Sequence, residues 1–431
     1  MSDIATALES IIGQPFLIKT EPDVLDFTNP IAKANLIIIA QGKTLDFPLP
    51  NKSVDLIKLI GQLQFYFSKS KLLIGWNAKN LFSYIGYITG KSFPAVTIID
   101  LKILESFLGE SNSCPTLFKH VKDRLEAITK NKHWAQLKTI YKSIHIPLIC
   151  KIIPEIEILG LAHTKKRKIV HPYYEVEGQV NGRMKCSSLY SNGFNPHILT
   201  EEDKQFLTTP CFDDKEFIYF DFKNMEVSVL QWLSKDKMLE NILKRGNDVY
   251  ESIWETLTNL ECSPERRKIC KSFFLPVVFG QGVASLSENV GIPLESSKKI
   301  VNRIYKVFST AMTWISSKDI NSVKIDVDHF GRHRRFEEEY YRTQLRNFHV
   351  QAPASIVCLD KLVKIYEGIK PFGKVCFHVH DGYCVIPNSG EENRVIKLGR
   401  EILEKEEDLY PGLRLRVAVS RGKKLNKLEK I

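Results

Sequence analysis

The sequence predicts a multidomain α+β protein whose N-terminal part is an α/β domain. A chain of 431 residues is long enough for several domains of about 150 residues each. Apolar or alternating runs at 16–21 and 35–49 predict strands, because Pro, Asn and Gly bound them. Segments 53–68, 79–88 and 98–109 have helical patterns, and Gly109 provides a helix end.

The rest of the chain mixes helix-rich and strand-rich sequence. A basic helical region is predicted at 116–144, and segment 165–200 predicts a hairpin with a turn at Asn181-Gly182. An apolar strand at 217–222 ends on a carboxylate. The predicted helices that follow run from Met225 to about Trp232 and over 236–260, 264–280 and 294–317, and late strands are predicted at 374–386 and 413–420.

Amino-acid composition and net charge limit the classes of function that this chain can have. Apolar residues make up 43% of the chain and charged residues 26%, which excludes a largely disordered chain. The net charge is +11, and segment 111–190, with 14 basic and 6 acidic residues, holds most of the excess. Such a segment is typical of a site for a polyanion such as nucleic acid, although a solvated lysine-rich face has the same composition.

The sequence gives no sign of a membrane or of an oxidising compartment. No apolar run approaches the ~18 residues of a membrane span, and the N-terminus lacks the pattern of a secretory signal. The nine cysteines are scattered, with no Cys-x-x-Cys, which argues against a disulfide framework or a zinc site. We therefore expect a reduced, intracellular location and no membrane partner.

Two aspartates are candidates for catalysis. Asp221 ends an apolar strand, and Asp381 lies between two strand-like runs. Buried β-structure does not accommodate a carboxylate unless the carboxylate is paired or binds a metal. Two aspartates that hold two divalent ions between them are suited to phosphoryl transfer. Taken singly, each is an ordinary strand-end or turn residue.

A helix at 264–280 carries a third candidate feature. Arg267, Lys271, Leu275 and Phe279 recur every four residues and so lie along one helix face. Its cationic half suits a triphosphate and its apolar half suits a base. The alternative is an amphipathic helix with a basic N-terminus, but cations there oppose the helix dipole.

Together these segments resemble the DNA polymerases of family A, the bacterial DNA polymerase I family. The segments that resemble motifs A, B and C are DFKNMEVSVL (221–230), RRKICKSFFLPVVFGQG (266–282) and HVHDGYCVI (378–386). Further similar segments are NGRMKCSS (181–188), GNDVY (246–250), FGRHRRF (330–336) and NFHVQ (347–351). The resemblance covers about 180–431. It implies a right-hand polymerase with an antiparallel palm sheet, helical fingers and a short thumb.

The resemblance implies a role for each matching residue in the chemical step. Asp221 and Asp381, with the backbone carbonyl of Phe222, would bind two Mg²⁺ ions, for which Mn²⁺ can substitute. Arg267 and Lys271 would hold the incoming triphosphate. Lys271 would also act as general acid for the pyrophosphate.

Other matching residues would contact the nucleotide or the DNA. Glu226 matches a steric gate against the ribose 2′-hydroxyl, and the remaining nucleotide-binding positions are Tyr250, Leu275 and Phe279. The positions that match DNA-binding residues are Arg183, Asn347, Gln351 and His380. Leu275 stands where the family usually has an aromatic residue, and Phe279 stands where it usually has a tyrosine. Gly382 stands where motif C has a Glu.

The N-terminal third resembles a 3′→5′ proofreading exonuclease more faintly. FLIKTE (16–21) and LIGWNAKNLFSYIG (73–86) resemble its first two motifs, but Lys19 and Leu81 replace metal-binding aspartates. A two-metal nuclease does not keep its metals without them. The resemblance therefore implies an RNase H-like domain without nuclease activity, and an unrelated α/β domain is the alternative.

The implied domains are an exonuclease-like domain (1–112), a reduced basic thumb (113–200), palm (201–234 and 345–431) and fingers (235–344). The expected function is a template-directed DNA polymerase without proofreading, in the cytoplasm of a bacterial or phage-infected cell. Its partners would be primer-template DNA and dNTPs, and the short thumb predicts low processivity unless a partner protein assists. The alternatives are a polymerase with relaxed sugar or lesion-bypass specificity and a non-catalytic DNA-binding replication scaffold.

Overall fold

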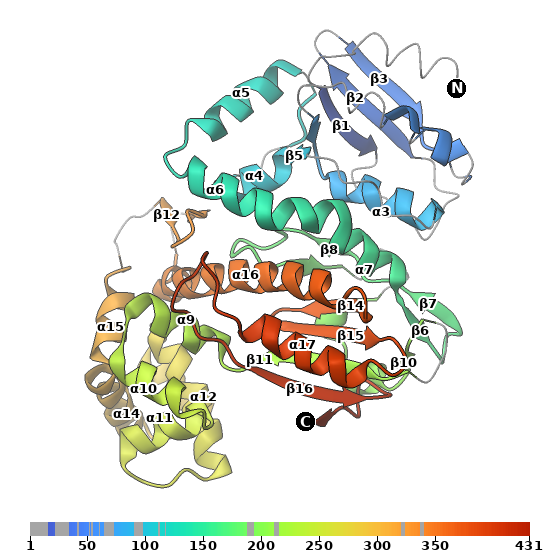
Figure 1. Cartoon of the computed structure of the whole chain (residues 1–431). Coiled ribbons are helices and arrows are strands. Elements are labelled where there is room, and N and C mark those ends of the chain that lie inside the picture. The colour runs from blue at the N-terminus through green and yellow to red at the C-terminus, as the bar shows by residue number, and fades with distance from the viewer. Residues whose placement is uncertain are drawn as a thin grey trace. The chain divides into compact units, whose positions relative to one another are not determined.

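The computed structural model (Figure 1) describes most of the chain. The described residues are 16–21, 34–40, 43–50, 52, 55–59, 61–63, 73–89, 98–110, 113–116, 118–187, 194–210, 215–319, 324–336 and 340–431. The chain divides into two compact units. The first comprises 1–221, 358–402 and 418–431, and the second comprises 222–357 and 403–417.

A mixed five-stranded sheet lies in the N-terminal part of the first unit. Its strands, in the order β3-β2-β1-β4-β5, are β3 (Lys43–Pro48), β2 (Asn35–Ala40), β1 (Phe16–Glu21), β4 (Leu73–Gly75) and β5 (Ile98–Asp100). Strands β1, β2 and β3 pair antiparallel, whereas β1, β4 and β5 pair parallel. The predicted strand at 35–49 is thus a pair of strands.

The helices beside this sheet agree partly with the prediction. Helix α3 (Ala78–Thr89) matches the helix predicted at 79–88, and residues 55–59 and 61–63 are helical within 53–68. The remainder of 53–68 lies outside the described residues. The prediction for 98–109 was wrong at its start, because β5 precedes α4 (Leu101–Phe107). The Asp100 side chain accepts hydrogen bonds from the N–H groups of Lys102 and Ile103, so the helix begins only after it.

A long helical stretch connects this sheet to the rest of the first unit. It consists of α5 (Phe118–Thr129), α6 (Trp134–Ile140), the π-helical turns η1 (Tyr141–His145) and η2 (Leu148–Ile152), and α7 (Ile153–Leu159). A buried ion pair joins α3 to α7, with Lys79 Nζ 2.9 Å from Glu157 Oε1. The N-terminal part is therefore linked to this stretch by charge as well as by apolar packing.

Two small sheets follow. One has the order β10-β6-β7 and contains β6 (Leu161–His163), β7 (Lys168–Val170) and β10 (Leu207–Thr208). The other pairs β8 (Tyr174–Glu175) with β9 (Lys185–Cys186), and this hairpin confirms the one predicted within 165–200. The two-residue turn was wrong, because a longer loop closes with the Gly182 N–H donating to the Gln179 carbonyl at 2.8 Å. Short helices η4 (Pro196–Ile198) and α8 (Glu201–Lys204) precede β10.

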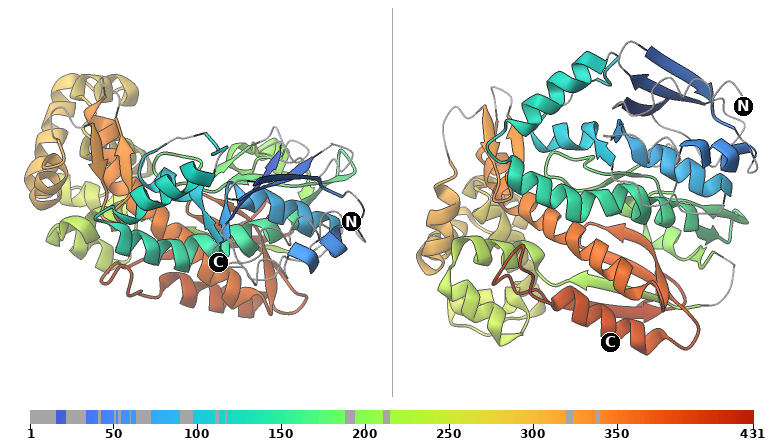
Figure 2. Two further views of the ribbon diagram at one scale, coloured as in Figure 1. Left: turned by 90° about the horizontal axis from the view of Figure 1, so that it is seen from above. Right: turned by 45° about the horizontal axis from the view of Figure 1, so that its top comes forward.

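A second five-stranded sheet forms the core of the first unit. Its order is β14 (Gly373–Val379), β15 (Gly382–Pro387), β11 (Phe217–Phe222), β16 (Val417–Gly422) and β17 (Glu429–Lys430). Strand β15 pairs antiparallel with both β14 and β11. Helices α16 (Arg342–Ile369) and α17 (Glu392–Glu404) lie side by side in Figure 2. A Cβ added to Gly399 would contact the Phe220 ring, so α17 packs on the face of β11 that carries Phe220.

The opposite face of this sheet packs on the small three-stranded sheet. A buried apolar cluster joins Phe217, Phe377 and Cys384 of the large sheet to Leu161 and Leu207 of the small one. Because side chains alternate along a strand, Tyr219 and Asp221 project on the same face as Phe217. Asp221 therefore lies on the face of the large sheet that carries the apolar cluster, near the end of strand β11.

The second unit is mainly helical. Its helices are α9 (Met225–Ser234), α10 (Lys237–Arg245), α11 (Val249–Thr258), α12 (Pro264–Val278), α13 (Val283–Val290), α14 (Leu294–Val307), α15 (Ser309–Ser316) and the first half of α16. A hairpin of β12 (Ile325–Val327) and β13 (His333–Arg335) completes it. The single helix predicted at 236–260 is two helices, because Gly246 adopts φ 80 and Asp248 caps the next helix. The helix predicted at 294–317 is likewise divided at Phe308.

Candidate active site

Two aspartates lie at one end of the large sheet, Asp221 on strand β11 and Asp381 in the turn before the neighbouring strand β15. Asp221 pairs in register with Gly382, the first residue of β15. Asp381 directly precedes Gly382 in the turn between β14 and β15, where His380 has φ 53. Asp221 is exposed and Asp381 is partly exposed. The structure therefore brings together the two carboxylates that the sequence predicts as metal ligands.

The negative charges of both carboxylates shift the pKa values of the same two side chains. Burial raises the pKa of the Tyr219 phenol, and the negative charges of Asp221 and Asp381 raise it further. Burial raises the pKa of the Cys358 thiol as well, again with contributions from Asp381 and Asp221. Since Coulomb interactions weaken with distance, Tyr219 and Cys358 lie near both carboxylates.

Tyr219 fills the space beside Gly382. A Cβ built on Gly382 would overlap the Tyr219 hydroxyl and lie 2.6 Å from Cζ and 3.1 Å from Cε1 of the ring. The ring centroid lies 6.4 Å from that of Phe377 on β14. Sequence reasoning missed Tyr219. Its position two residues before Asp221 on an alternating strand was the signal that it shares the aspartate's face.

Histidines and one arginine surround the turn that carries Asp381. His378 is buried and its Nδ1 lies 3.2 Å from the Gly382 carbonyl oxygen, while the rings of His197 and His380 are 4.8 Å apart. Burial, followed by the neighbouring imidazoles, lowers the pKa of His378 to about 3. Burial and His380 lower the pKa of His197 to about 4. The charge of Arg183 contributes to both pKa shifts, so the predicted Arg183 and His380 lie near this turn.

The predicted triphosphate cations lie on α12 of the second unit. Arg267 donates a 2.6 Å hydrogen bond to Asp248, which itself caps α11 by accepting from the N–H of Tyr250. This hydrogen bond raises the pKa of Arg267. The Arg267 and Lys271 cations each lie 6.0 Å from the Tyr250 ring centroid. The structure thus joins three predicted residues and adds Asp248, whose carboxylate offsets the cationic start of α12.

Leu275 and Phe279 continue the same line along α12, and both are partly buried. Pro276 lies inside the helix, and α12 ends two residues later at Val278, short of the predicted end at 280. The Phe279 N–H donates to the Leu275 carbonyl oxygen at 2.9 Å. Gly280 adopts φ 85 and the Gln281 N–H donates to the Pro276 carbonyl oxygen at 2.9 Å, so a left-handed glycine ends the helix.

The predicted steric gate has a partner within the second unit. Gln351 Nε2 of α16 donates a 3.0 Å hydrogen bond to Oε1 of Glu226, in the first turn of α9. The hydrogen bond therefore joins two residues that the resemblance assigned to the nucleotide and to the DNA. Asn347 lies one turn earlier on α16, and its buried amide oxygen has no hydrogen-bond partner among the described residues.

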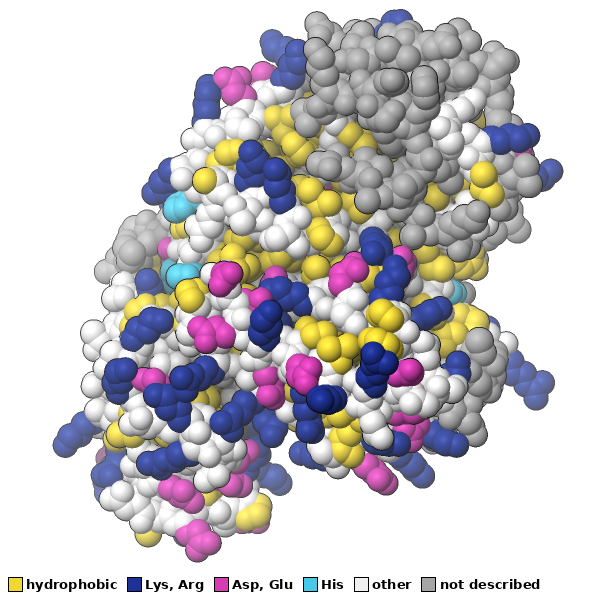
Figure 3. All heavy atoms as spheres, viewed as in Figure 1, with side chains coloured by type: hydrophobic (Ala, Val, Ile, Leu, Met, Phe, Trp, Pro, Cys, Tyr) yellow, Lys and Arg dark blue, Asp and Glu magenta, His cyan; other side chains and the backbone are white. Residues whose placement is uncertain are grey.

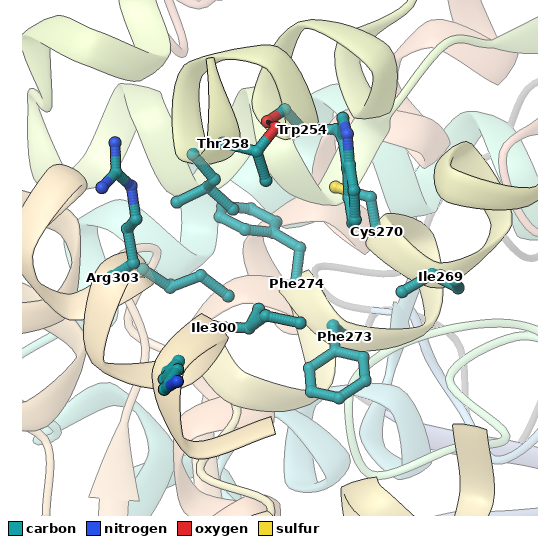
Figure 4. Close-up of a pocket in the computed structure, with 11 residues that line it drawn as sticks. Trp254, Thr258, Ile269, Cys270, Phe273, Phe274, Ile300 and Arg303 are labelled. Carbon is teal, nitrogen blue, oxygen red and sulfur yellow. Dashed lines mark hydrogen bonds between the residues drawn. The ribbon is translucent and has the colours of Figure 1, made fainter. Parts of the chain in front are cut away.

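A cavity of about 190 Å³ lies behind α12, between α11, α12 and α14 (Figure 4). Its wall is mainly apolar and includes Trp254, Cys270, Phe273, Phe274 and Ile300. The cavity was not predicted. The sequence pattern that could have indicated the cavity is a second apolar stripe of α12, at Ile269, Cys270 and Phe273. This stripe faces away from the two cationic side chains of the helix.

The N-terminal residues that match nuclease motifs do not form a carboxylate cluster. Lys19 is partly buried in β1 and Leu81 is buried in α3, while Glu21 is exposed at the end of β1. Among the described residues, no group of three or more His, Cys, Asp or Glu side chains is arranged to hold a metal ion. No helix in the described part of the chain is long and apolar enough to cross a membrane.

Basic side chains are widely distributed over the surface. On the face in Figure 3, Lys and Arg are interspersed with Asp and Glu. Within the basic segment, the exposed Lys165, Lys166, Arg167 and Lys168 form the β6–β7 turn and the start of β7. The Lys165 ammonium lies 5.1 Å from the Phe206 ring centroid. A basic turn beside an aromatic ring suits a phosphate backbone.

Sequence comparisons identify similar proteins. The profile of DNA polymerase family A matches residues 112–427. The chain is 22% identical over 268 residues to the DNA polymerase of Bacillus phage SP01, covering 55% of this chain and 29% of that protein. It is 23% identical over 345 residues to DNA polymerase I of Borreliella burgdorferi, covering 75% of this chain and 34% of that protein. The chain thus spans about a third or less of the length of these curated relatives.

A solved structure has the same fold. The POL domain of Pol1 from M. smegmatis, in complex with DNA primer-template and dNTP, matches with a TM-score of 0.72. The match covers 98% of this chain and 98% of that domain at 14% sequence identity. The shared fold therefore includes the N-terminal part of this chain, which lies outside the matched profile.

Proposed function

Since this chain belongs to DNA polymerase family A, we propose that it is a template-directed DNA polymerase that adds deoxynucleotides to a primer 3′ end. The observation that carries the proposal is the placement of Asp221, on β11, and Asp381, in the turn before β15, at one end of the large sheet. The proposed substrates are primer-template DNA and dNTPs.

The two aspartates fit divalent ions. Mg²⁺ is usually held by one or two protein carboxylates together with water and substrate phosphates, so this pair of aspartates suits it. Two bound ions would activate the primer hydroxyl and stabilise charge on the pyrophosphate. Asp221 and Asp381, with the Phe222 carbonyl, are the groups of this chain that we assign to holding them.

The second unit supplies cations for the triphosphate. Lys271 is exposed on α12 and is free to move toward a phosphate, whereas Arg267 must exchange Asp248 for it. We assign proton donation to the pyrophosphate to Lys271. Glu226 is assigned to excluding the ribose 2′-hydroxyl, in a position that Gln351 holds by a hydrogen bond.

The proposed layout keeps the boundaries expected from the sequence, with palm at 201–234 and 345–431 and fingers at 235–344. Segment 113–200 is the proposed thumb and 1–112 the proposed exonuclease-like domain. Lys19 and Leu81 support the absence of proofreading, because neither side chain is a metal-binding carboxylate. A separate partner for processivity belongs to the same proposal.

Primer extension with Mg²⁺ tests the function. Wild type is compared with Asp381→Ala, and with Asp408→Ala as a matched loss of an exposed carboxylate. We expect templated extension with dNTPs that is abolished by Asp381→Ala and retained by Asp408→Ala. Equal extension with rNTPs would instead support relaxed sugar specificity. Well-folded wild type that binds DNA without extending it would support a replication scaffold.

A further inference from the structure

Position 382 has no side chain, although its backbone can carry one. Gly382 pairs with Asp221 and follows Asp381, so a side chain there would project on the face of the sheet that carries Asp221, beside the turn that holds Asp381. Gly382 is not among the glycines with positive φ, and its backbone is therefore accessible to any residue. What excludes a side chain is Tyr219, whose hydroxyl and ring edge a Cβ at 382 would overlap.

The ring of Tyr219 is held by apolar packing, and its hydroxyl is the polar end of the side chain. Its ring packs against the apolar cluster of the first unit and near Phe377. Its hydroxyl reaches the position beside Gly382, within the electrostatic influence of Asp221 and Asp381. The packed aromatic ring thus places one hydroxyl at the acidic end of the sheet. Because the ring is rigid, the Tyr219 side chain loses little conformational freedom when it holds this position.

We propose that Tyr219 is a positioning residue of this acidic site, and that its hydroxyl takes the place of a side chain at position 382. The inference rests on the proposed function, because the two aspartates are taken as the metal-holding pair. The hydroxyl donates a hydrogen bond to a carboxylate oxygen or to water bound at the carboxylates, and so orients them.

The substitution of a phenol for an acidic group has an electrostatic consequence. A tyrosine hydroxyl is uncharged near neutral pH, so it adds no charge to those of Asp221 and Asp381. We therefore expect weaker divalent-ion binding than in a site with an added carboxylate. Groups that orient metal ligands typically change metal affinity 10- to 100-fold when they are removed.

Two substitutions separate the hydroxyl from the ring. Tyr219→Phe removes the hydroxyl alone, and Tyr383→Phe is the matched control. Tyr383 is a buried tyrosine of the same sheet, and its hydroxyl donates to the Cys358 carbonyl oxygen at 2.8 Å. Mn²⁺ binding to the full chain, measured by the EPR signal of free Mn²⁺, is the readout independent of catalysis. The Mg²⁺ concentration for half-maximal primer extension is the second readout.

An exchange of residues tests the shared space. Gly382→Glu alone is expected to disrupt the site because it overlaps Tyr219. The double variant Tyr219→Ser/Gly382→Glu vacates that space and is expected to bind Mn²⁺ at least about tenfold more tightly than wild type. Recovery of folding relative to Gly382→Glu would show that the two side chains share this space, and Tyr219→Phe tests separately whether the hydroxyl affects metal binding.

The outcomes are distinct. We expect Tyr219→Phe to weaken Mn²⁺ binding about tenfold and to raise the Mg²⁺ requirement, with less than a twofold change in Tyr383→Phe. Unchanged Mn²⁺ affinity in Tyr219→Phe, or no gain in the double variant over Gly382→Glu, overturns the proposal. Wild type that binds Mn²⁺ without extending primers overturns the polymerase function, and Mn²⁺ affinity then decides the role of Tyr219. Wild type that binds no Mn²⁺ overturns both.

Discussion

Replacing Glu157 with glutamine breaks the buried ion pair between α7 and α3. The Glu157 carboxylate accepts hydrogen bonds from Lys79 Nζ at 2.9 Å, Ser83 Oγ at 2.6 Å and the Tyr174 N–H at 2.6 Å. The side chains of Lys79 and Glu157 are 3% and 0% exposed. The substitution keeps the size and one acceptor oxygen but leaves the Lys79 charge buried without its counter-charge.

The expected cost follows from that charge. Removing one partner of a buried ion pair destabilises proteins by about 3–5 kcal/mol. Removing both charges, in Lys79→Met/Glu157→Gln, is expected to cost less than Glu157→Gln alone, because no unpaired charge remains. Glu155→Gln on the same helix is the matched control, and its side chain is 30% exposed. We expect this control to cost about 1 kcal/mol or less.

Urea unfolding followed by tryptophan fluorescence measures these differences in the free energy of unfolding. Burial lowers the pKa of Lys79 from 10.5, and the charge of Glu157 opposes that shift. In Glu157→Gln the pKa of Lys79 falls further, so the unfolded state binds more protons and stability rises with pH toward 10.5. A loss below about 1 kcal/mol for Glu157→Gln, or additive losses in the double variant, would refute the reasoning.

Four further predictions concern the second unit. Cys270→Leu adds apolar volume to the cavity between α11, α12 and α14 and is expected to raise the free energy of unfolding by about 0.5–2 kcal/mol, measured in urea; a decrease would show that the larger side chain does not fit there. Asp248→Asn retains the helix cap but releases Arg267, and steady-state kinetics should show a KM for dNTP up to about fivefold lower, the equivalent of a 1 kcal/mol salt bridge. An unchanged KM would count against a competing role for Asp248. Glu226→Ala should increase ribonucleotide incorporation in gel-based extension, and unaltered sugar selection would exclude Glu226 as the gate. Leu275 should give discrimination against dideoxynucleotides, which Leu275→Tyr should reduce; equal incorporation of both nucleotide types by wild type would contradict this.

The residues of the candidate site could be proposed from the sequence because the proposal depends on residue types and their order. The apolar strand that ends at Asp221, the Asp381 segment and the four-residue spacing of Arg267 and Lys271 are local patterns. Boundaries were predicted less well. The helix predicted at 236–260 is divided at Gly246, and the long helix α16 was not predicted as an element. Its interior Pro353 weakens the local helical signal.

The sequence by itself determined that two aspartates, two cations and the glutamate proposed as a gate are present, together with a basic segment ahead of them. The tertiary structure decided which residues meet. Asp221 and Gly382 are far apart in the chain, and their pairing depends on strand register, which local propensity does not specify. The same long-range packing places Tyr219 in the space at Gly382, Asp248 on Arg267 and Glu157 on Lys79. Each of these contacts joins segments whose mutual position is set by burial of apolar faces, a property of the folded chain as a whole.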